Sequence, residues 1–187
     1  MAANRREGRR ASLTVALCGM AAALSAVLML LSGVIPIATY ATPLLAALLL
    51  FPVRLELGVK AGWAAWLTTA VLTLLLGLDK EAALFYAFVG WWPLVKWPLD
   101  LHIRRKGIRL LVKTGIFALC VAGMYSIIVW VLHLDAVTAE LREMGVWMTA
   151  AFLAGLVACL LLYDRLLTPL SLLYVRRFQP RVRRLLR

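Results

Sequence analysis

The sequence predicts an all-α, polytopic integral membrane protein with six transmembrane helices and both termini in the cytoplasm. Three observations lead to this fold class. The 187-residue chain is 64% hydrophobic and only 16% charged, whereas a soluble domain is about half apolar and a quarter charged. Several apolar runs approach the ~20 residues that a membrane-spanning helix needs. Lys and Arg gather between alternate runs, which indicates how the helices are oriented.

Six apolar runs are expected to form the helices, and polar or proline-containing segments separate them: 12–33, 43–51, 58–76, 81–99, 110–132 and 146–163. The first run is too long for a typical signal peptide, so we interpret it as a retained helix. The second run is short for a full crossing. The stretch after 163 is expected to continue as a tilted or in-plane segment. Residues 1–10 and 177–187 are then basic cytoplasmic tails around one transmembrane domain, 11–176.

The basic residues support this topology. Both tails and the second and fourth loops are rich in Lys and Arg, while the first, third and fifth loops together contain only Lys80 and Arg142. Because cytoplasmic loops carry the excess of basic residues, this alternation places the two tails inside. The net charge of +12 is therefore attributed to orientation and to anionic lipid. A nucleic-acid partner is not expected, because no basic face is joined to a soluble fold.

The segment 78–100 combines charges, aromatic rings and prolines, and it begins at the predicted third loop, on the outer side. Asp79, Lys80 and Glu81 stand at the start of the fourth predicted helix. In one interpretation they are a plain helix start, with Asp79 as the cap and Glu81 near the positive end of the helix dipole. In the other, they form the polar mouth of a cavity.

Helical geometry extends this second interpretation along the fourth helix. A straight helix would place five side chains on one stripe, from a carboxylate past three rings to an amine: Glu81, Phe85, Phe88, Trp92 and Lys96. Pro93 interrupts the stripe and frees the carbonyl of Val89. In a bilayer, a freed carbonyl must find a partner or line a cavity.

Two further residues invite a functional interpretation. Inserting a lysine such as Lys96 at the centre of a bilayer costs about 2.5–3.5 kcal/mol of free energy. It either extends to the inner headgroups beside Trp91, Trp92 and Trp97, pairs inside the bundle, or contacts a ligand. His133, at the outer end of the fifth helix, is either solvated or a pocket residue.

Small residues recur four apart on the first helix, and this spacing lets another helix approach closely. They form two offset pairs, Gly19 with Ala23 and Ala22 with Ala26. The partner is either another helix of this chain or a separate protein.

Enzyme chemistry is not predicted, and no catalytic residue, cofactor or metal ligand is assigned. The sequence has no HExxH, no GxSxG and no phosphate-binding glycine loop. The three cysteines lie in apolar runs without CxxC spacing, so neither a disulfide framework nor a zinc site is expected. A membrane-embedded enzyme acting on lipid would need an acid–base pair at headgroup depth, and Asp79 and Glu81 diverge on a helix.

The stretches SLTVALCGMAAALSAVLMLL and IPIATYATPLLAALLLFPVRLELGVKAGWAAWLTTAVLTLLLG, with the size and predicted topology, resemble the substrate-binding S component of energy-coupling factor (ECF) transporters. The match covers an alanine-spaced first helix, a proline-bearing outer loop, a short second helix and a glycine-led third helix. It spans most of the chain.

The resemblance implies a substrate-capture subunit for a vitamin or similar small molecule in a bacterial plasma membrane. Its partners would be a transmembrane T component, docked by Ala22 and Ala26, and two cytoplasmic ATPases. A ligand pocket would open outward from the odd-numbered loops and the outer halves of helices four to six. The predicted binding residues, which include four of the five stripe residues, are Tyr40, Asp79, Lys80, Glu81, Phe85, Tyr86, Trp92, Lys96 and His133. No ligand signature is present, and the alternative is a non-transport membrane scaffold or assembly protein.

Overall fold

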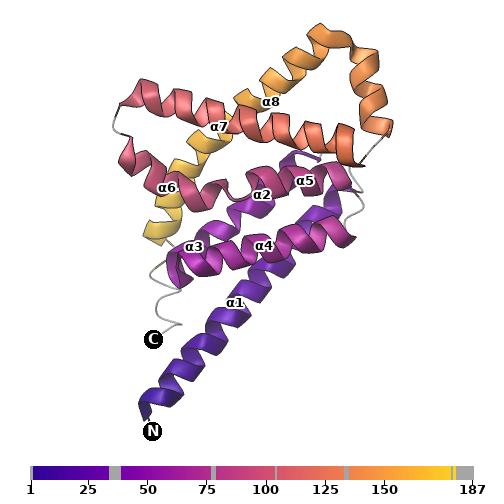
Figure 1. Ribbon diagram of the computed structural model, residues 1–187. Helices are drawn as coiled ribbons and strands as arrows, with labels where there is room; N and C mark the ends of the chain where they lie inside the picture. Colours follow the sequence, from indigo (N-terminus) through magenta and orange to yellow (C-terminus); the bar gives the residue numbers. More distant parts are fainter. Residues whose placement is uncertain are drawn as a thin grey trace. The chain divides into compact units, whose positions relative to one another are not determined.

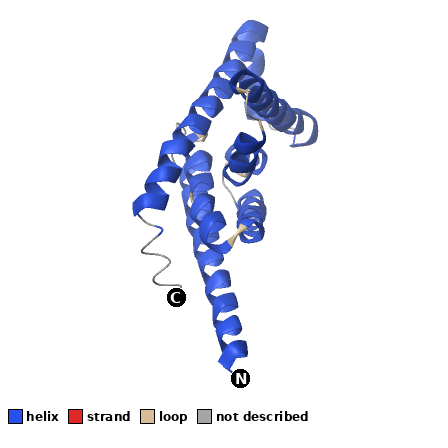
Figure 2. Cartoon of the chain, turned by 90° about the vertical axis from the view of Figure 1, so that its left-hand side faces the viewer, coloured by secondary structure: helices blue, strands red, loops and turns tan. Residues whose placement is uncertain are grey.

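The structure is a computed structural model that describes residues 2–33, 39–76, 79–103, 105–132, 135–177 and 179. Every regular element in these ranges is a helix (Figure 2), which confirms the all-α prediction. The chain divides into two compact units. Unit 1 comprises residues 1–95 and 167–187, and unit 2 comprises residues 96–166.

Four helices in the described part of the chain contain segments long and apolar enough to cross a membrane: Val15–Ser32, Val59–Leu76, Lys106–Trp130 and Glu143–Arg177. This supports a membrane protein. The two other predicted spans, 43–51 and 81–99, are each divided between two shorter helices. Six crossings with both termini inside therefore stay a prediction.

Unit 1 is built around α1 (Ala2–Ser32), which packs against α2 (Ala41–Leu48) and α4 (Val59–Leu76). Small residues allow the close approach, since Ala46 and Ala47 are fully buried. The hydroxyl of Ser25 donates to the carbonyl of Ala46 at 3.2 Å. The N-terminal part of α1 projects past α4 (Figure 1). The helix thus begins ten residues before its predicted start, because Ala and Arg in residues 2–10 favour helix.

The second predicted helix is two helices, α2 and α3 (Leu50–Leu57). Pro52 explains the division, because its ring clashes with the carbonyl four residues earlier, and that residue is Leu48, the last of α2. Gly58 ends α3 with a positive φ of 93°, a conformation that glycine adopts without steric cost. The chain then turns directly into α4.

The fourth predicted helix is also two helices, α5 (Lys80–Val89) and α6 (Trp92–His102). Pro93 sits in the first turn of α6, where a missing N–H is tolerated, and Gly90 closes α5 with a 2.7 Å bond from its N–H to the carbonyl of Tyr86. The straight stripe predicted for this segment is therefore wrong. Glu81 to Trp92 belong to unit 1, whereas Lys96 belongs to unit 2.

Unit 2 contains the end of α6, then α7 (Lys106–Ile127), the π-helical segment η2 (Ile128–Leu132) and most of α8 (Asp135–Arg177). Gly145, with φ of 73°, divides α8 by a kink. Much of the predicted fifth loop is thus helical. The continuation expected after 163 is present as helix, because α8 runs on to Arg177 with Pro169 inside it.

Candidate functional site

Two polar clusters stand out among the described residues, one in each unit. The α5 turn consists of Tyr40, Asp79, Lys80 and Glu81, which lie in unit 1. The charge cluster lies in unit 2 and consists of Lys96, Asp100, Arg109, Lys113 and Asp164. All four members of the α5 turn were predicted from the sequence, but Lys96 is the only predicted binding residue in the charge cluster.

In the α5 turn, Asp79 and Lys80 complete the ends of two helices. The Asp79 carboxylate accepts a hydrogen bond from the N–H of Ala82 at 3.0 Å, so the predicted N-cap is confirmed. The Lys80 ammonium donates to the carbonyl of Leu74 at 2.7 Å, near the end of α4. The last carbonyls of a helix lack intrahelical hydrogen-bond donors, and the Lys80 ammonium supplies a donor for one of them. Both side chains therefore have structural roles at this turn.

Glu81 makes the longer-range contact. The Tyr40 hydroxyl donates a hydrogen bond to its carboxylate, and the Tyr40 ring meets the Phe85 ring edge-on at a centroid distance of 5.3 Å. Tyr40 and Glu81 are each half-buried. The fold thus brings together three predicted binding residues from two separate segments.

The other predicted aromatic residues lie in the interior of unit 1. Phe85 and Tyr86 are fully buried, and Trp92 is 1% exposed. The Tyr86 hydroxyl is buried and faces Thr69 without a hydrogen bond of standard geometry. Buried hydroxyls are normally paired, so Tyr86 is the buried polar group of this region that most needs an explanation.

The charge cluster joins three helices. Lys96 of α6 lies 2.7 Å from Asp164 Oδ1, and Lys113 of α7 lies 2.7 Å from Asp164 Oδ2 on α8. Lys113 also lies 2.6 Å from Asp100, and Lys96 donates to the carbonyl of Asp164 at 2.6 Å. Lys96, Lys113 and Asp164 are each less than 10% exposed. Each oxygen of the central carboxylate thus has its own ammonium.

Sequence spacing explains part of this geometry. Lys96 and Asp100 are four apart on α6, and Arg109 and Lys113 are four apart on α7, so each pair shares one helix face. The hypothesis that Lys96 extends to headgroups is wrong for this structure, and pairing inside the bundle is what it shows. Lys113 was not predicted, although it is the single charge in the apolar run 110–132 and such a charge is a functional candidate by default in a membrane. Asp164 stands beside Arg165 after the run 146–163, where the sequence suggests an interfacial ion pair, whereas the structure pairs Asp164 with Lys96 and Lys113.

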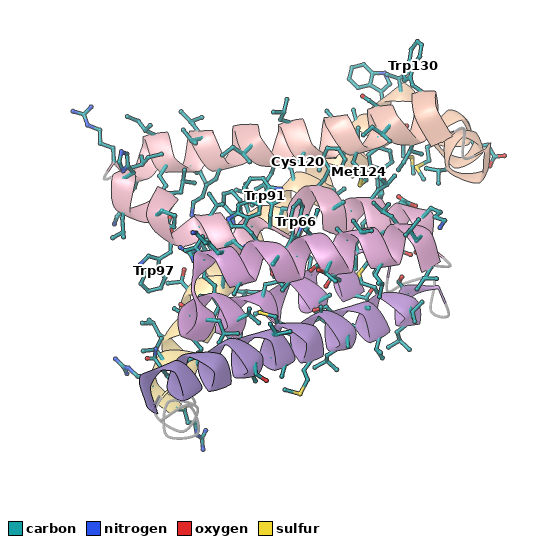
Figure 3. The ribbon with its side chains drawn as sticks, turned by 60° about the horizontal axis from the view of Figure 1, so that its bottom comes forward. Trp66, Trp91, Trp97, Cys120, Met124 and Trp130 are labelled. Carbon is teal, nitrogen blue, oxygen red and sulfur yellow. The ribbon has the colours of Figure 1, made fainter. Side chains whose placement is uncertain are left out.

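The tryptophans predicted to flank Lys96 have different environments. Trp97 is 46% exposed, while Trp92 is buried. Trp91 is half-buried and stacks on Trp63 at 6.5 Å, and Trp63 meets Trp66 edge-on at 5.4 Å. Figure 3 shows Trp97 pointing away from its helix. Of the three, Trp97 has the exposure expected of an interfacial residue.

The small residues of α1 fall on two faces. Ala22 and Ala26 are each 7% exposed, and the Ala22 carbonyl is 3.5 Å from the Thr69 hydroxyl of α4. This face packs within the chain, which is one of the two predicted alternatives. Gly19 and Ala23 are exposed and remain the residues of this set that another protein would reach. His133 lies outside the described residues.

Residues that bind metals do not gather in the described part of the chain. No group of three or more His, Cys, Asp or Glu side chains there has the geometry to hold an ion. Cys18, Cys120 and Cys159 are free thiols. The chain matches no protein-family model, no curated protein and no solved structure. The resemblance to S components therefore rests on the sequence features alone.

Proposed function

We propose that the chain is the membrane-embedded substrate-capture subunit of an ECF-type uptake transporter for a vitamin or similar small molecule. Partner subunits supply ATP hydrolysis. The observation that carries the proposal is that Tyr40 contacts both Glu81 of the α5 turn and the ring of Phe85. It joins the segment before α2 to the start of α5, two segments for which the resemblance implies a role in binding.

The chemistry of this contact suits ligand binding. Small-molecule sites combine apolar and aromatic walls with a few placed polar groups. Here the half-buried Tyr40 phenol contacts the half-buried Glu81 carboxylate and the buried ring of Phe85. The basic-residue pattern assigns this turn to the outer side of the membrane, where an uptake protein meets its substrate.

The proposal is tested by purifying the chain from bacterial cells in mild detergent and identifying what comes with it by mass spectrometry. The expected result is a transmembrane partner, ATPase subunits and a retained small molecule. Purification with neither an ATPase nor a small molecule would contradict the proposal.

The site is tested separately with two variants, Glu81→Gln and Tyr40→Phe. Because a hydrogen bond to a charged group contributes about 1.5–3 kcal/mol, each variant should lower ligand retention roughly tenfold or more. Glu143→Gln, which alters an exposed carboxylate of unit 2, serves as the matched control. Unchanged retention in both test variants would remove the α5 turn from the site.

A second function, a non-transport membrane scaffold, is favoured by one observation. Charges in the charge cluster pair with one another, as expected if they hold helices together. Purification of a stable protein complex without an ATPase or small molecule would support this alternative.

A further inference from the structure

Unit 1 contains a second feature, away from the α5 turn: a groove of about 290 Å³. One wall is formed by Leu17, Ala21 and Leu24, which recur along one stripe of α1. The opposite wall comes from α3 and the residue before it, and Tyr174 of α8 also lines the groove. Phe51 of α3 meets Tyr174 edge-on at 6.2 Å, which connects α3 to this part of α8.

The lining of the groove is almost entirely apolar. The two lining residues with polar side-chain groups are Glu56 and Tyr174. The α1 wall belongs to a segment apolar enough to cross a membrane, and Leu24 is 53% exposed. A polar solute would find few hydrogen-bond partners here. A hydrocarbon chain would lose nothing on entry, because the walls are as apolar as the lipid around them.

Basic residues lie close in sequence to the lining residues of α3 and α8. The described segments 54–60 and 174–177 contain four basic residues and one acidic residue, Glu56. Arg54 is partly buried and donates to the carbonyl of Pro93 at 3.2 Å. Lys60 and Arg176 are exposed. Lys60 follows the lining residue Leu57 by three positions, across the turn at Gly58, and Arg176 follows Tyr174 by two positions on α8. Long basic side chains can extend over such short separations to bring their charge to a neighbouring surface.

We infer that this groove binds an anionic phospholipid, with an acyl chain against α1 and α3 and the phosphate beside Lys60 and Arg176. Apolar walls next to a basic rim match the two parts of such a lipid. Each basic residue near a membrane surface contributes about 1 kcal/mol of attraction to anionic lipid. The excess of positive charge here outweighs the single carboxylate of Glu56. This inference does not depend on the transport proposal.

The experiment is native mass spectrometry of the full purified chain, titrated with phosphatidylglycerol or with phosphatidylcholine of the same acyl chains. Wild type should bind phosphatidylglycerol more tightly. The variant Lys60→Gln/Arg176→Gln should lose roughly fivefold in affinity for phosphatidylglycerol per charge removed, with phosphatidylcholine unchanged. Ala21→Trp fills the groove and should weaken both lipids. Ala23→Trp adds the same ring to an exposed face of α1 and should weaken neither.

Three outcomes would overturn the inference: equal affinity of wild type for the two lipids, an unchanged Lys60→Gln/Arg176→Gln variant, or a photo-crosslinker at Ala21 that captures a protein helix instead of lipid. Circular dichroism establishes that Ala21→Trp is folded. Should that variant fail to fold, the charge variant still decides, because both of its positions are exposed.

Discussion

The α5 turn and the charge cluster each contain acidic and basic side chains, but they satisfy them in different ways. In the α5 turn, Asp79 and Lys80 bind backbone groups at helix ends, and Glu81 accepts from a phenol while half-buried. In the charge cluster, Lys96 and Lys113 are buried against the same carboxylate. Removing a charge from water costs several kcal/mol, and good pairing geometry must offset it. Burial therefore makes the charge cluster a structural connection, whereas the charged groups of the α5 turn are partly open to their surroundings.

The largest expected effect comes from breaking the cluster at its centre. Asp164→Asn removes the carboxylate that two buried ammonium groups share and leaves both of them to Asp100, which lies 2.6 Å from Lys113 and 3.5 Å from Lys96. Losing one partner of a buried ion pair costs about 3–5 kcal/mol, and because Asp100 remains, the cost here should fall toward the lower end. Thermal unfolding in detergent should show a large loss of stability. The triple variant Lys96→Met/Lys113→Met/Asp164→Leu removes the three buried charges together and leaves the partly exposed Asp100 beside Arg109, so it should recover most of the loss. A small effect of Asp164→Asn would show that the cluster is solvated and contributes little.

An intermediate effect is expected at the division between α5 and α6. A Cβ on Gly90 would lie 2.5 Å from the backbone carbonyl oxygen of Tyr86, which cannot move without shifting α5. Gly90→Ala should therefore cost about 1–3 kcal/mol, as overpacking typically does, measured by the same unfolding experiment. The control is Gly155→Ala on α8, where nothing lies within 4 Å of the new Cβ. Equal stability of the two variants would contradict the packing argument.

The smallest effect is expected at the helix cap of the α5 turn. Asp79→Ala removes the acceptor for the N–H of Ala82 and should cost about 1 kcal/mol in unfolding free energy. Asp79→Asn keeps an oxygen acceptor and should cost less. A cap effect as large as that of Asp164→Asn would mean that burial does not separate the two clusters in the way argued here.

Much of the local structure could be predicted because it depends on neighbouring residues. The α4 helix appears where its apolar run predicts it, and Asp79 caps α5 as its position suggests. The division at Gly90 follows from Pro93, the residue that the sequence already indicates as an interruption of the stripe. Residues 135–145 were predicted as part of the fifth loop because they are rich in charges, but the structure shows that they are helical.

The candidate site was predicted only in part, because its contacts join residues that are far apart in the sequence. Tyr40 and Glu81 were chosen singly, and the fold brings them into contact. Lys96 was recognised as costly in a membrane, but its partner is 68 residues away on α8. No short-range pattern connects the two positions.

The sequence by itself determined that this chain is helical and has segments apolar enough to cross a membrane, because hydrophobic content and segment length are properties of the residues alone. Its prolines and glycines also determined where helices divide and turn. Only the tertiary structure decided which charges are neutralised, since Lys96, Lys113 and Asp164 meet through helix packing. It likewise decided that Ala22 and Ala26 pack inside the chain while Gly19 and Ala23 stay exposed. Contacts between distant segments depend on how helices are arranged, and that arrangement is not encoded in any single stretch.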